Sequence, residues 1–541
     1  MKATFPAETG TKTVVLLFAL LGAVNVYRAS TQSITYDEAV TYDAFVVGPL
    51  RNAFTGYNAN NHVLFSVLAK FTTAALGPSE LGLRLPSVLA GWVYFVVVFL
   101  LCRHLFGRGP IFALAAVALA CNPLVLDFLS AARGYGVALA LFMVALYQVV
   151  VILVSSSSSH GGAGRGRWVV VSLALGGAVS ANLTFLFPAV GLGMAALTLT
   201  AVDTLGAGRA SLWRFARTTV LSLAGPGPVM AAVLLVVPLT LAEREHFTYG
   251  ASGLSETVTS LVNLSVWHHP TGWYIDTVGE MVGSVVSTYL VPLTLATLFA
   301  TAGIIGARAV RARKSSVLTA QDRALLLLAG TLTITLAQLV AVHYLWDVPY
   351  PLDRTGLYFV PMFVLVPPLV ADRAGVWRRG SRVVRGCSLV FLSLLLSLFL
   401  AQFNMTQYGM WRFDAGTRTL YDITARWPDT GPDASFRIAA SWLLRPSLNH
   451  YRFVDPTSRV ISVSDGVAGV QPTQFDFAVV TDWVWGDVEL SRGVASLICT
   501  HPVSGAMLFV NRFSPAARGL DSVRRTVPPG ADCEQVLRAL R

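Results

Sequence analysis

The chain has 541 residues, of which 54% are hydrophobic and only 13% are charged, and its mean hydropathy is +0.61. Several apolar runs approach the roughly 20 residues that a helix needs to cross about 30 Å of hydrocarbon. The composition excludes an ordinary soluble globular protein and predicts a polytopic α-helical membrane protein.

The apolar runs predict about 11 transmembrane helices. The first run follows Lys12 and lacks a small-residue cleavage site, so we interpret it as a retained span and not as a cleaved signal peptide. The predicted spans are residues 13–28, 85–102, 109–126, 134–154, 168–183, 185–202, 218–241, 282–303, 324–343, 355–371 and 386–403.

The basic residues are unevenly divided between the two sides of this topology. With the N-terminus inside, the inward segments carry 19 of the 40 Lys and Arg residues, whereas the outward loops before residue 404 carry 7. This asymmetry is the positive-inside signature, and it predicts that the part from Asn404 onward lies outside. The net charge of +11 is therefore explained by topology, and we exclude a nucleic-acid partner.

The first outward loop, residues 29–84, begins with a cluster of acids: Asp37, Glu38 and Asp43 lie within seven positions of one another. Carboxylates at a membrane surface are rare without a cation, a proton or a polar substrate to meet them. Asp37 and Glu38 are therefore the first candidates for a functional site. A solvated loop after the first span explains the same spacing equally well.

The same loop continues with an apolar segment at residues 60–76 that contains Asn, His, Ser and Lys. It is too short and too polar for a span, so we expect an amphipathic helix that lies in the membrane interface.

Two outward arginines run against the positive-inside bias: Arg133 at the start of the fourth span and Arg354 before the tenth. Each has a tyrosine nearby, Tyr135 and Tyr358 respectively. Such an arginine needs an anionic partner, or it extends its charged end to the interface.

Histidines in the outward loops suggest a divalent metal as a further possibility. His62 and one of the neighbours His268 and His269 could ligate it beside a carboxylate. Only one of the two adjacent histidines is expected to face a given site, because neighbouring side chains point apart. The alternative for His62 is an interfacial histidine bonded to the backbone.

Residues 404–541 differ in character from the rest, with intermittent hydrophobicity and nearly balanced charge. A helix at 414–426 and strands at 436–440, 459–463, 475–481 and 506–511 are predicted, which favours a small α/β domain with its own core. Five cysteines are too few for a disulfide framework, but Cys499 and Cys533 both lie in this part and could pair if the compartment is oxidising. The predicted domains are thus 1–403, transmembrane, and 404–541, extracytoplasmic.

Four segments in this order resemble the C-type (GT-C) membrane glycosyltransferases: TYDEAVTYDAF, NNHVLFSVLAKFTTAALGPSELGLRLPSVLAG, AARGYGVALALFMVALYQ and PYPLDRTGLYFVPMF. Within this superfamily they are most similar to the polyprenyl-phosphate-sugar-dependent protein O-mannosyltransferases and the lipid A aminoarabinose transferase. The chain departs from the family pattern at Val63 and Leu64, where prolines are usual. The likeness is densest over residues 30–150 and only architectural after residue 404.

The resemblance implies a role for each candidate residue. Asp37 would take the proton from the acceptor, with inversion at the anomeric carbon, and Glu38 would orient Asp37 or assist a metal. The donor phosphate would be held by Arg133, Tyr135, Arg354 and Tyr358.

These implications together predict an integral membrane glycosyltransferase, in a multi-pass bacterial plasma-membrane setting. It would move a hexose or pentose from a polyprenyl-phosphate donor to a lipid, glycan or protein acceptor on the outer face. The alternatives are a transporter or flippase of a lipid-linked saccharide and a non-catalytic scaffold. A translocation path is disfavoured because the acids lie outside the apolar runs.

Overall fold

The computed structural model describes residues 7–541 except 55, 57, 156–162, 206–212, 214, 269–272, 313–317, 376–381, 429–433, 467–471 and 529. Its contacts divide the chain into two compact units. The first unit comprises Met1–Val26, Ala53–Leu68 and Leu85–Phe403, and the second comprises Tyr27–Asn52, Ala69–Arg84 and Asn404–Arg541. The second unit thus groups most of the predicted first outward loop with the residues after 404.

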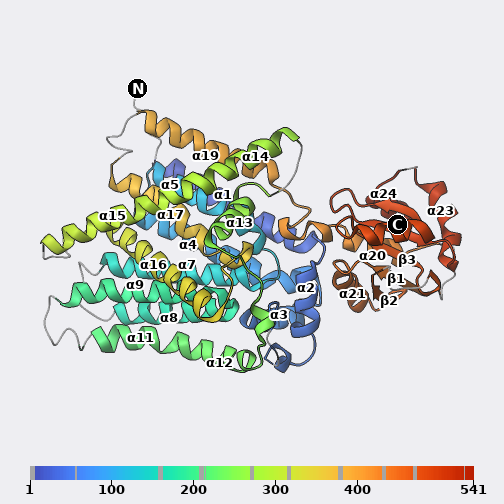
Figure 1. Ribbon diagram of the computed structural model, residues 1–541, viewed down its shortest axis with the longest axis horizontal. Helices are drawn as coiled ribbons and strands as arrows, with labels where there is room; N and C mark the ends of the chain where they lie inside the picture. The colour runs from blue at the N-terminus through green and yellow to red at the C-terminus, as the bar shows by residue number, and fades with distance from the viewer. Residues whose placement is uncertain are drawn as a thin grey trace. The chain divides into compact units, whose positions relative to one another are not determined.

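The helices of the first 250 residues are these: α1 Ala7–Thr31, α2 Tyr36–Thr41, η1 Tyr42–Val46, η2 Leu50–Ala53, α3 Val63–Leu76, α4 Glu80–Phe106, α5 Pro110–Ala120, α6 Pro123–Phe128, α7 Gly134–Ser155, α8 Ala163–Ala181, η3 Leu183–Phe185, α9 Leu186–Leu205, η4 Ala216–Val220, α11 Leu221–Ala224, α12 Pro226–Thr240 and η5 Arg244–Phe247. The next group runs to residue 402: α13 Leu254–Val266, α14 Trp273–Val285, η6 Val286–Leu290, α15 Val291–Ala312, α16 Ala320–Trp346, η8 Asp353–Gly356, α17 Phe359–Arg373 and α19 Arg382–Gln402. Within the first unit, α7, α8 and α12 pack in succession, and α9 packs on α16 (Figure 1).

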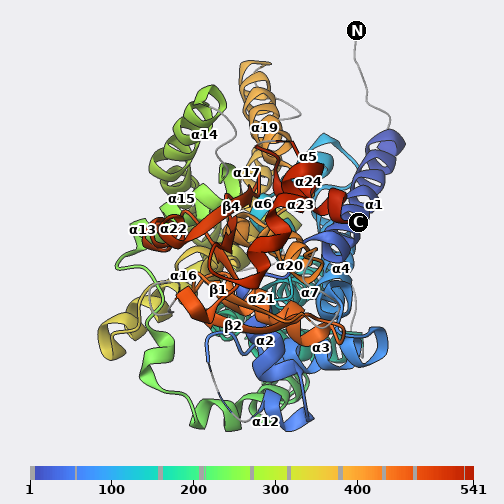
Figure 2. The ribbon, with the colours of Figure 1, turned by 90° about the vertical axis from the view of Figure 1, so that its right-hand side faces the viewer.

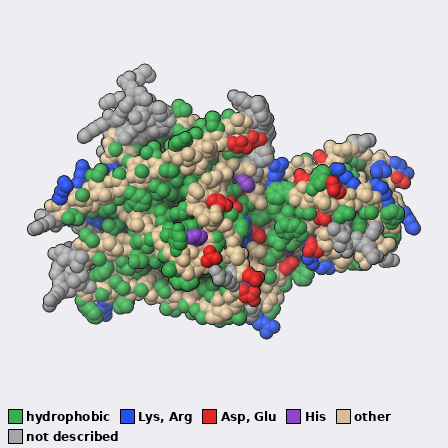
Figure 3. Space-filling view, in the orientation of Figure 1, with side chains coloured by type: hydrophobic (Ala, Val, Ile, Leu, Met, Phe, Trp, Pro, Cys, Tyr) green, Lys and Arg blue, Asp and Glu red, His purple; other side chains and the backbone are tan. Residues whose placement is uncertain are grey.

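Seven helices of the described chain are long and apolar enough to cross a membrane: Gly10–Thr31, Glu80–Phe106, Gly134–Val154, Leu183–Val202, Ala216–Thr240, Asp276–Arg311 and Ala320–Trp346. Hydrophobic side chains dominate the visible helical face of the first unit, as expected for a surface that meets lipid (Figure 3). These features support an integral membrane protein, and the number of 11 spans stays a prediction.

The predicted span at residues 109–126 is broken in the structure. Helix α5 ends at Ala120, and α6 starts anew at Pro123. Asn122 caps the new helix, because its Oδ1 accepts a hydrogen bond from the Val125 backbone N–H at 3.1 Å. The N–H of the first helical residue has no partner within a helix, so proline, which lacks an N–H, costs nothing at that position. This sequence therefore favours a new helix at Pro123 over a continuous span.

The second unit contains a five-stranded sheet with the order β2-β1-β3-β5-β4. Its strands are β1 Phe436–Ala440, β2 Val460–Asp465, β3 Phe477–Val480, β4 Ala495–Thr500 and β5 Met507–Asn511. Strand β1 is parallel to β2 and β3, whereas β5 is antiparallel to β3 and β4.

The helices of the second unit after residue 404 are η9 Gly409–Asp414, α20 Thr417–Ala425, α21 Arg445–Val454, η10 Pro472–Gln474, α22 Trp485–Val494, η11 Pro515–Ala517, α23 Arg518–Thr526 and α24 Cys533–Leu540. Figure 2 shows α21 beside β2. The predicted helix and all four predicted strands are present within a few residues of their expected bounds. Strand β4 was not predicted.

Candidate active site

The acidic segment of the first loop forms the short helix α2, which the sequence itself caps. The side chain of Thr35 accepts a hydrogen bond from the Glu38 N–H at 3.4 Å, and the Glu38 carboxylate accepts one from the Thr35 N–H at 2.9 Å. This reciprocal capping box satisfies two backbone donors at the helix start. Carboxylates in the first turn are also stabilised by the helix dipole, so the sequence favours a helix that begins here.

Glu38 forms a bidentate ion pair with Arg84, a residue for which the sequence suggested no role. Arg84 Nε donates to Glu38 Oε1 at 2.8 Å, and Nη2 donates to Oε2 at 2.6 Å. Both side chains are completely buried. Arg84 also donates to the carbonyl oxygens of Ala29, Gln32 and Ser33 at 3.3, 2.7 and 2.8 Å. The pair therefore holds α2 against the end of α1.

A second carboxylate for which the sequence suggested no role, Asp414, also supports α2. Asp414 Oδ2 accepts a hydrogen bond from the Tyr36 N–H at 2.6 Å, and its Oδ1 accepts one from the Thr417 hydroxyl at 3.2 Å. Burial raises the pKa of Asp414 to about 8, because its charged form is desolvated. Asp414 thus fixes the first turn of α2, which bears Asp37.

Asp37 itself is largely buried, with 7% of its surface exposed. Adjacent residues of a helix point about 100° apart, so Asp37 and Glu38 face different directions. The hydrogen bonds of Arg84 go to Glu38 and to backbone carbonyls. The two acids are therefore in different chemical settings: Glu38 belongs to a structural ion pair, and Asp37 lies on the helix that this pair positions.

The first unit contains a separate group of candidates around His62, just before α3. The His62 ring contacts the Tyr135 ring edge-to-face at 5.1 Å, and its Nδ1 lies 3.4 Å from Asn182 Nδ2. The Asn182 Oδ1 accepts hydrogen bonds from the N–H and hydroxyl of Thr184, so its amide nitrogen is the atom turned toward His62. Because that nitrogen is a donor, Nδ1 accepts and the ring proton lies on Nε2.

The surroundings of His62 are cationic. Its pKa is well below the usual value because the ring is buried, and because the Arg133 and Arg354 guanidinium groups disfavour a further positive charge. His62 Nε2 is buried and has no hydrogen-bond partner. A neutral imidazole donor near two guanidinium groups is an arrangement that suits an anion.

The start of α7 approaches His62 closely because residue 134 is glycine. A Cβ on Gly134 would lie 1.9 Å from the Ala181 carbonyl oxygen and 2.6 Å from His62 Cβ. The neighbouring Arg133 is 1% exposed, and its own carbonyl accepts a hydrogen bond from Ser87. The Arg-Gly-Tyr sequence therefore brings Arg133 and Tyr135 to His62 by removing the side chain between them.

Arg354 lies on η8, which is anchored to the segment around residue 250. Ala251 and Tyr350 form an antiparallel bridge, and the Tyr249 hydroxyl donates to Asp353 Oδ2 at 2.8 Å. The Arg354 guanidinium stacks over the Tyr249 ring at 5.0 Å. These contacts fix the position of Arg354.

The remaining candidates lie in other settings. The Tyr358 ring packs 5.5 Å from Phe185, and its buried hydroxyl has no hydrogen-bond partner. The backbone N–H of His268 donates to Gln402 Oε1 at 3.2 Å. His269 lies outside the described residues.

In the described part of the chain, no group of three or more His, Cys, Asp and Glu side chains could hold a metal ion. His62, the first histidine proposed as a ligand, has two guanidinium groups as its charged surroundings. The described donors at His62 therefore suit an anion better than a cation.

The chain is similar along most of its length to solved structures of two proteins. The crystal structure of ArnT from Cupriavidus metallidurans in the apo state shares 15% identity, with a TM-score of 0.46 over 92% of this chain and 97% of that chain. The structure of the same protein bound to undecaprenyl phosphate shares 15% identity, with a TM-score of 0.43 over 93% and 98%. The archaeal oligosaccharyltransferase AglB from Archaeoglobus fulgidus, in complex with an inhibitory peptide and a dolichol-phosphate, shares 12% identity, with a TM-score of 0.42 over 94% and 75%.

No protein-family model matches the chain, and no curated protein sequence matches it. At these identities and TM-scores, the structural likeness assigns no role to any residue. The roles of the candidate residues rest on the geometry described above.

Proposed function

We propose that the chain is an integral membrane glycosyltransferase that uses a polyprenyl-phosphate-linked sugar as its donor and inverts the anomeric carbon. Asp37 is the proposed base, and Glu38 positions it through Arg84. Arg133, Arg354 and the His62 N–H are the proposed partners of the donor phosphate, with Tyr135 and Tyr358 beside them.

The observation that carries this proposal is the set of donors around His62. Two guanidinium groups act on a neutral, buried imidazole whose Nε2–H has no partner. A buried donor without an acceptor costs about 1–3 kcal/mol, and a bound phosphate oxygen would remove that cost. The apolar helices of the same unit offer an environment for a polyprenyl chain.

The proposed reaction balances as a single displacement. The Asp37 carboxylate takes the proton of the acceptor nucleophile, a hydroxyl or an amine, while that nucleophile forms a bond to the anomeric carbon. The bond from that carbon to the phosphate oxygen breaks, and the electron pair leaves with the polyprenyl phosphate. Cations that meet the developing phosphate charge lower the barrier.

The proposed side of the membrane for this reaction is the outer one, as the positive-inside asymmetry predicts. Cys499 on β4 and Cys533 at the start of α24 form a disulfide in the structure, with a Cα–Cα distance of 5.1 Å. Disulfides persist in oxidising compartments and are rare in the cytosol. The pair therefore supports an extracytoplasmic location for residues 404–541.

The proposal is tested with membranes that contain the full chain and a panel of radiolabelled polyprenyl-phosphate hexoses and pentoses. We expect one donor to be consumed. Arg133→Gln and Arg354→Gln should each raise the donor KM by about tenfold or more, because each removes a charge-assisted contact worth about 1.5–3 kcal/mol. Arg51→Gln is the matched control, because it removes an exposed outward arginine and should leave the donor KM unchanged.

If the native chain consumes none of these donors, the proposal fails. A flipping assay with a lipid-linked saccharide would then test the transport alternative. If a donor is consumed but the Arg133 and Arg354 variants behave as Arg51→Gln does, the transferase stands and the phosphate assignment is wrong.

A further inference from the structure

The second unit contains an open pocket of about 710 Å³ that plays no part in the roles assigned above. One wall comes from the loop segment that follows Asp37: Val40 on α2 and Asp43 on η1. Val40 is three residues after Asp37, so it lies on a similar side of α2. The pocket therefore begins about one helical turn from the proposed base.

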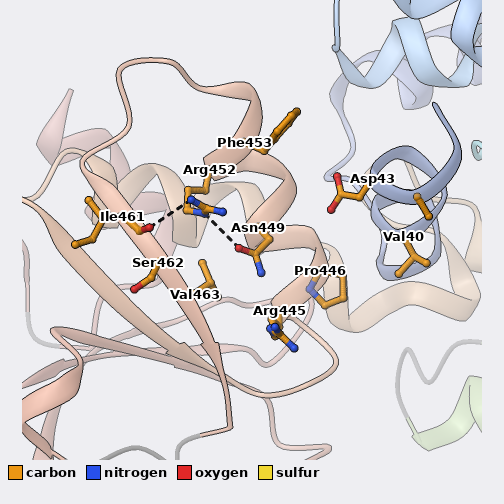
Figure 4. A pocket seen from close by; sticks show the side chains of 11 residues that line it. Val40, Asp43, Arg445, Pro446, Asn449, Arg452, Phe453, Ile461, Ser462 and Val463 are labelled. Atoms are coloured by element: carbon orange, nitrogen blue, oxygen red, sulfur yellow. Dashed lines mark hydrogen bonds between the residues drawn. The ribbon is translucent and has the colours of Figure 1, made fainter. Parts of the chain in front are cut away.

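The opposite wall is one face of α21 together with strand β2. Arg445, Asn449, Arg452 and Phe453 follow the spacing i, i+4, i+7 and i+8, which puts them on one side of the helix. Figure 4 shows Asn449 and Arg452 between β2 and Asp43, with Phe453 at the rim. One face of α21 thus lines the pocket, and the opposite face is buried in the domain.

The polar groups of this pocket are already oriented. Arg452 donates to Asn449 Oδ1 and to the Ile461 carbonyl oxygen, each at 3.3 Å. These bonds turn the Asn449 amide nitrogen outward as a donor. Asp43 is exposed toward the pocket and offers carboxylate oxygens as acceptors.

Each arginine that lines the pocket has a carboxylate as its counter-charge, although one of these carboxylates, Asp465, does not itself line the pocket. Arg445 pairs with Asp465 at 3.3 Å, and Arg452 acts on Asp43. Desolvation raises the pKa of Asp43 to about 6 in spite of that arginine, so near neutral pH the carboxylate is mostly charged. The lining itself holds two arginines and one carboxylate, and Asp465 beside Arg445 offsets the remaining positive charge, in contrast to the surroundings of His62.

The aromatic ring of Phe453 adds an apolar surface to the polar groups of the pocket. Phe453 is 59% exposed and contacts the Tyr42 ring at a centroid distance of 6.4 Å. An exposed aromatic ring beside paired donors and acceptors suits a ligand with one apolar face and many hydroxyl groups at its edge. A pyranose or furanose ring has this pattern.

We propose that this pocket, bounded by Asp43, Asn449, Arg452 and Phe453, binds an uncharged sugar residue of the acceptor. This inference rests on the proposed function, because a bound sugar is an acceptor only if the chain is a transferase. The pocket is then the place where an incoming glycan or glycolipid is held before transfer. The binding of a neutral saccharide can be measured whether or not transfer takes place.

The test uses the full chain in lipid nanodiscs without glycolipids or sugar-based detergents, which would occupy the pocket. Saturation-transfer NMR measures the binding of neutral trisaccharides of mannose, glucose, galactose and arabinose. We expect at least one to bind, and Asn449→Ala and Phe453→Ala should each weaken its binding by about tenfold, since each removes one hydrogen bond or one ring contact. Phe513→Ala is the control, because Phe513 is a 73% exposed aromatic residue of the same unit that does not line the pocket.

The outcomes separate this inference from the proposed function. Saccharide binding that persists in Asp37→Asn while transfer is lost supports both. Binding that is weakened by Phe453→Ala in a chain that transfers no sugar supports the pocket and refutes the transferase. The inference is overturned if no neutral trisaccharide binds, if Phe453→Ala binds as Phe513→Ala does, or if a sugar phosphate binds more tightly than the neutral sugar.

Discussion

The buried pair of Glu38 and Arg84 gives the sharpest stability prediction. Glu38→Gln keeps the size of the side chain but removes the charge that Arg84 meets at 2.6 and 2.8 Å. Arg84 would keep three backbone carbonyls as acceptors but would lack its carboxylate partner. Loss of one member of a completely buried pair costs about 3–5 kcal/mol, because the remaining charge stays desolvated.

The comparison is the pair of Arg418 and Glu80, which is half-exposed on the arginine side. Its distance is 3.0 Å, and the side chains of Arg418 and Glu80 are 47% and 12% exposed. Breaking it with Arg418→Gln should cost less than Glu38→Gln does, because Arg418 is solvated and Glu80 keeps the Tyr451 hydroxyl as a hydrogen-bond donor.

The assay measures the unfolding midpoint of the full chain in nanodiscs, with tryptophan fluorescence as the signal of unfolding. The double variant Glu38→Gln/Arg84→Met should be more stable than the sum of the two single effects predicts, by about 2–3 kcal/mol, because no unpaired charge remains. The reasoning is refuted if Glu38→Gln lowers the midpoint no more than Arg418→Gln does, or if the double variant shows simple additivity.

Three further predictions concern other parts of the chain. Replacing Cys499 and Cys533 by Ala should destabilise the second unit by about 4 kcal/mol, since the disulfide closes a loop with a sequence separation of 34; unchanged resistance to proteolysis would contradict this. Relative to Asp414→Asn, the native chain should lose stability as pH rises from about 4 to about 8, because folded Asp414 keeps its proton to about pH 8. The slope of this difference is at most about 1.4 kcal/mol per pH unit, and parallel profiles of midpoint against pH in the two proteins would contradict it. Gly134→Ala should lower the unfolding midpoint because its Cβ meets a backbone oxygen at 1.9 Å, whereas Gly303→Ala meets nothing within 4 Å and should not.

The positions of the helices in the first unit were the part of the fold that sequence patterns predicted best. Apolar runs and helix lengths depend on local composition, so a helix appears at each expected span. The break between α5 and α6 was missed, although Asn122 and Pro123 form a recognisable cap and helix start. At this point the apolar run predicted one continuous helix, whereas the Asn122 cap and Pro123 predicted a new helix start, and the structure has the new helix start.

The C-terminal domain shows the same limit. Strand β4 is an edge strand with an irregular register against β5, and its short apolar pattern resembles that of a loop. Helix α21 begins with Arg445 and Pro446 and alternates buried and pocket-facing residues. Its amphipathic spacing was readable, but only the sheet shows which face is covered.

The sequence indicated which residues belong to the candidate site, but it did not show which side chains pair with one another. Asp37 and Glu38 are adjacent in the sequence, and nothing in their spacing shows that Glu38 pairs with Arg84, 46 residues away. One signal could have identified Arg84. It is an outward arginine at the start of a helix, against the positive-inside bias. Asp414 carried no such signal, because its proximity to α2 arises from contacts across 378 residues.

The proposal that Asp37 is the catalytic base is tested most directly by comparing transfer by the native chain and by Asp37→Asn with a saturating donor. Both proteins should be purified to equal amounts and should show the same unfolding midpoint. We expect the rate constant for transfer to fall by about 10²–10⁴-fold, which is the usual contribution of a general base. A folded Asp37→Asn protein that transfers sugar within a few-fold of the native rate would contradict the account.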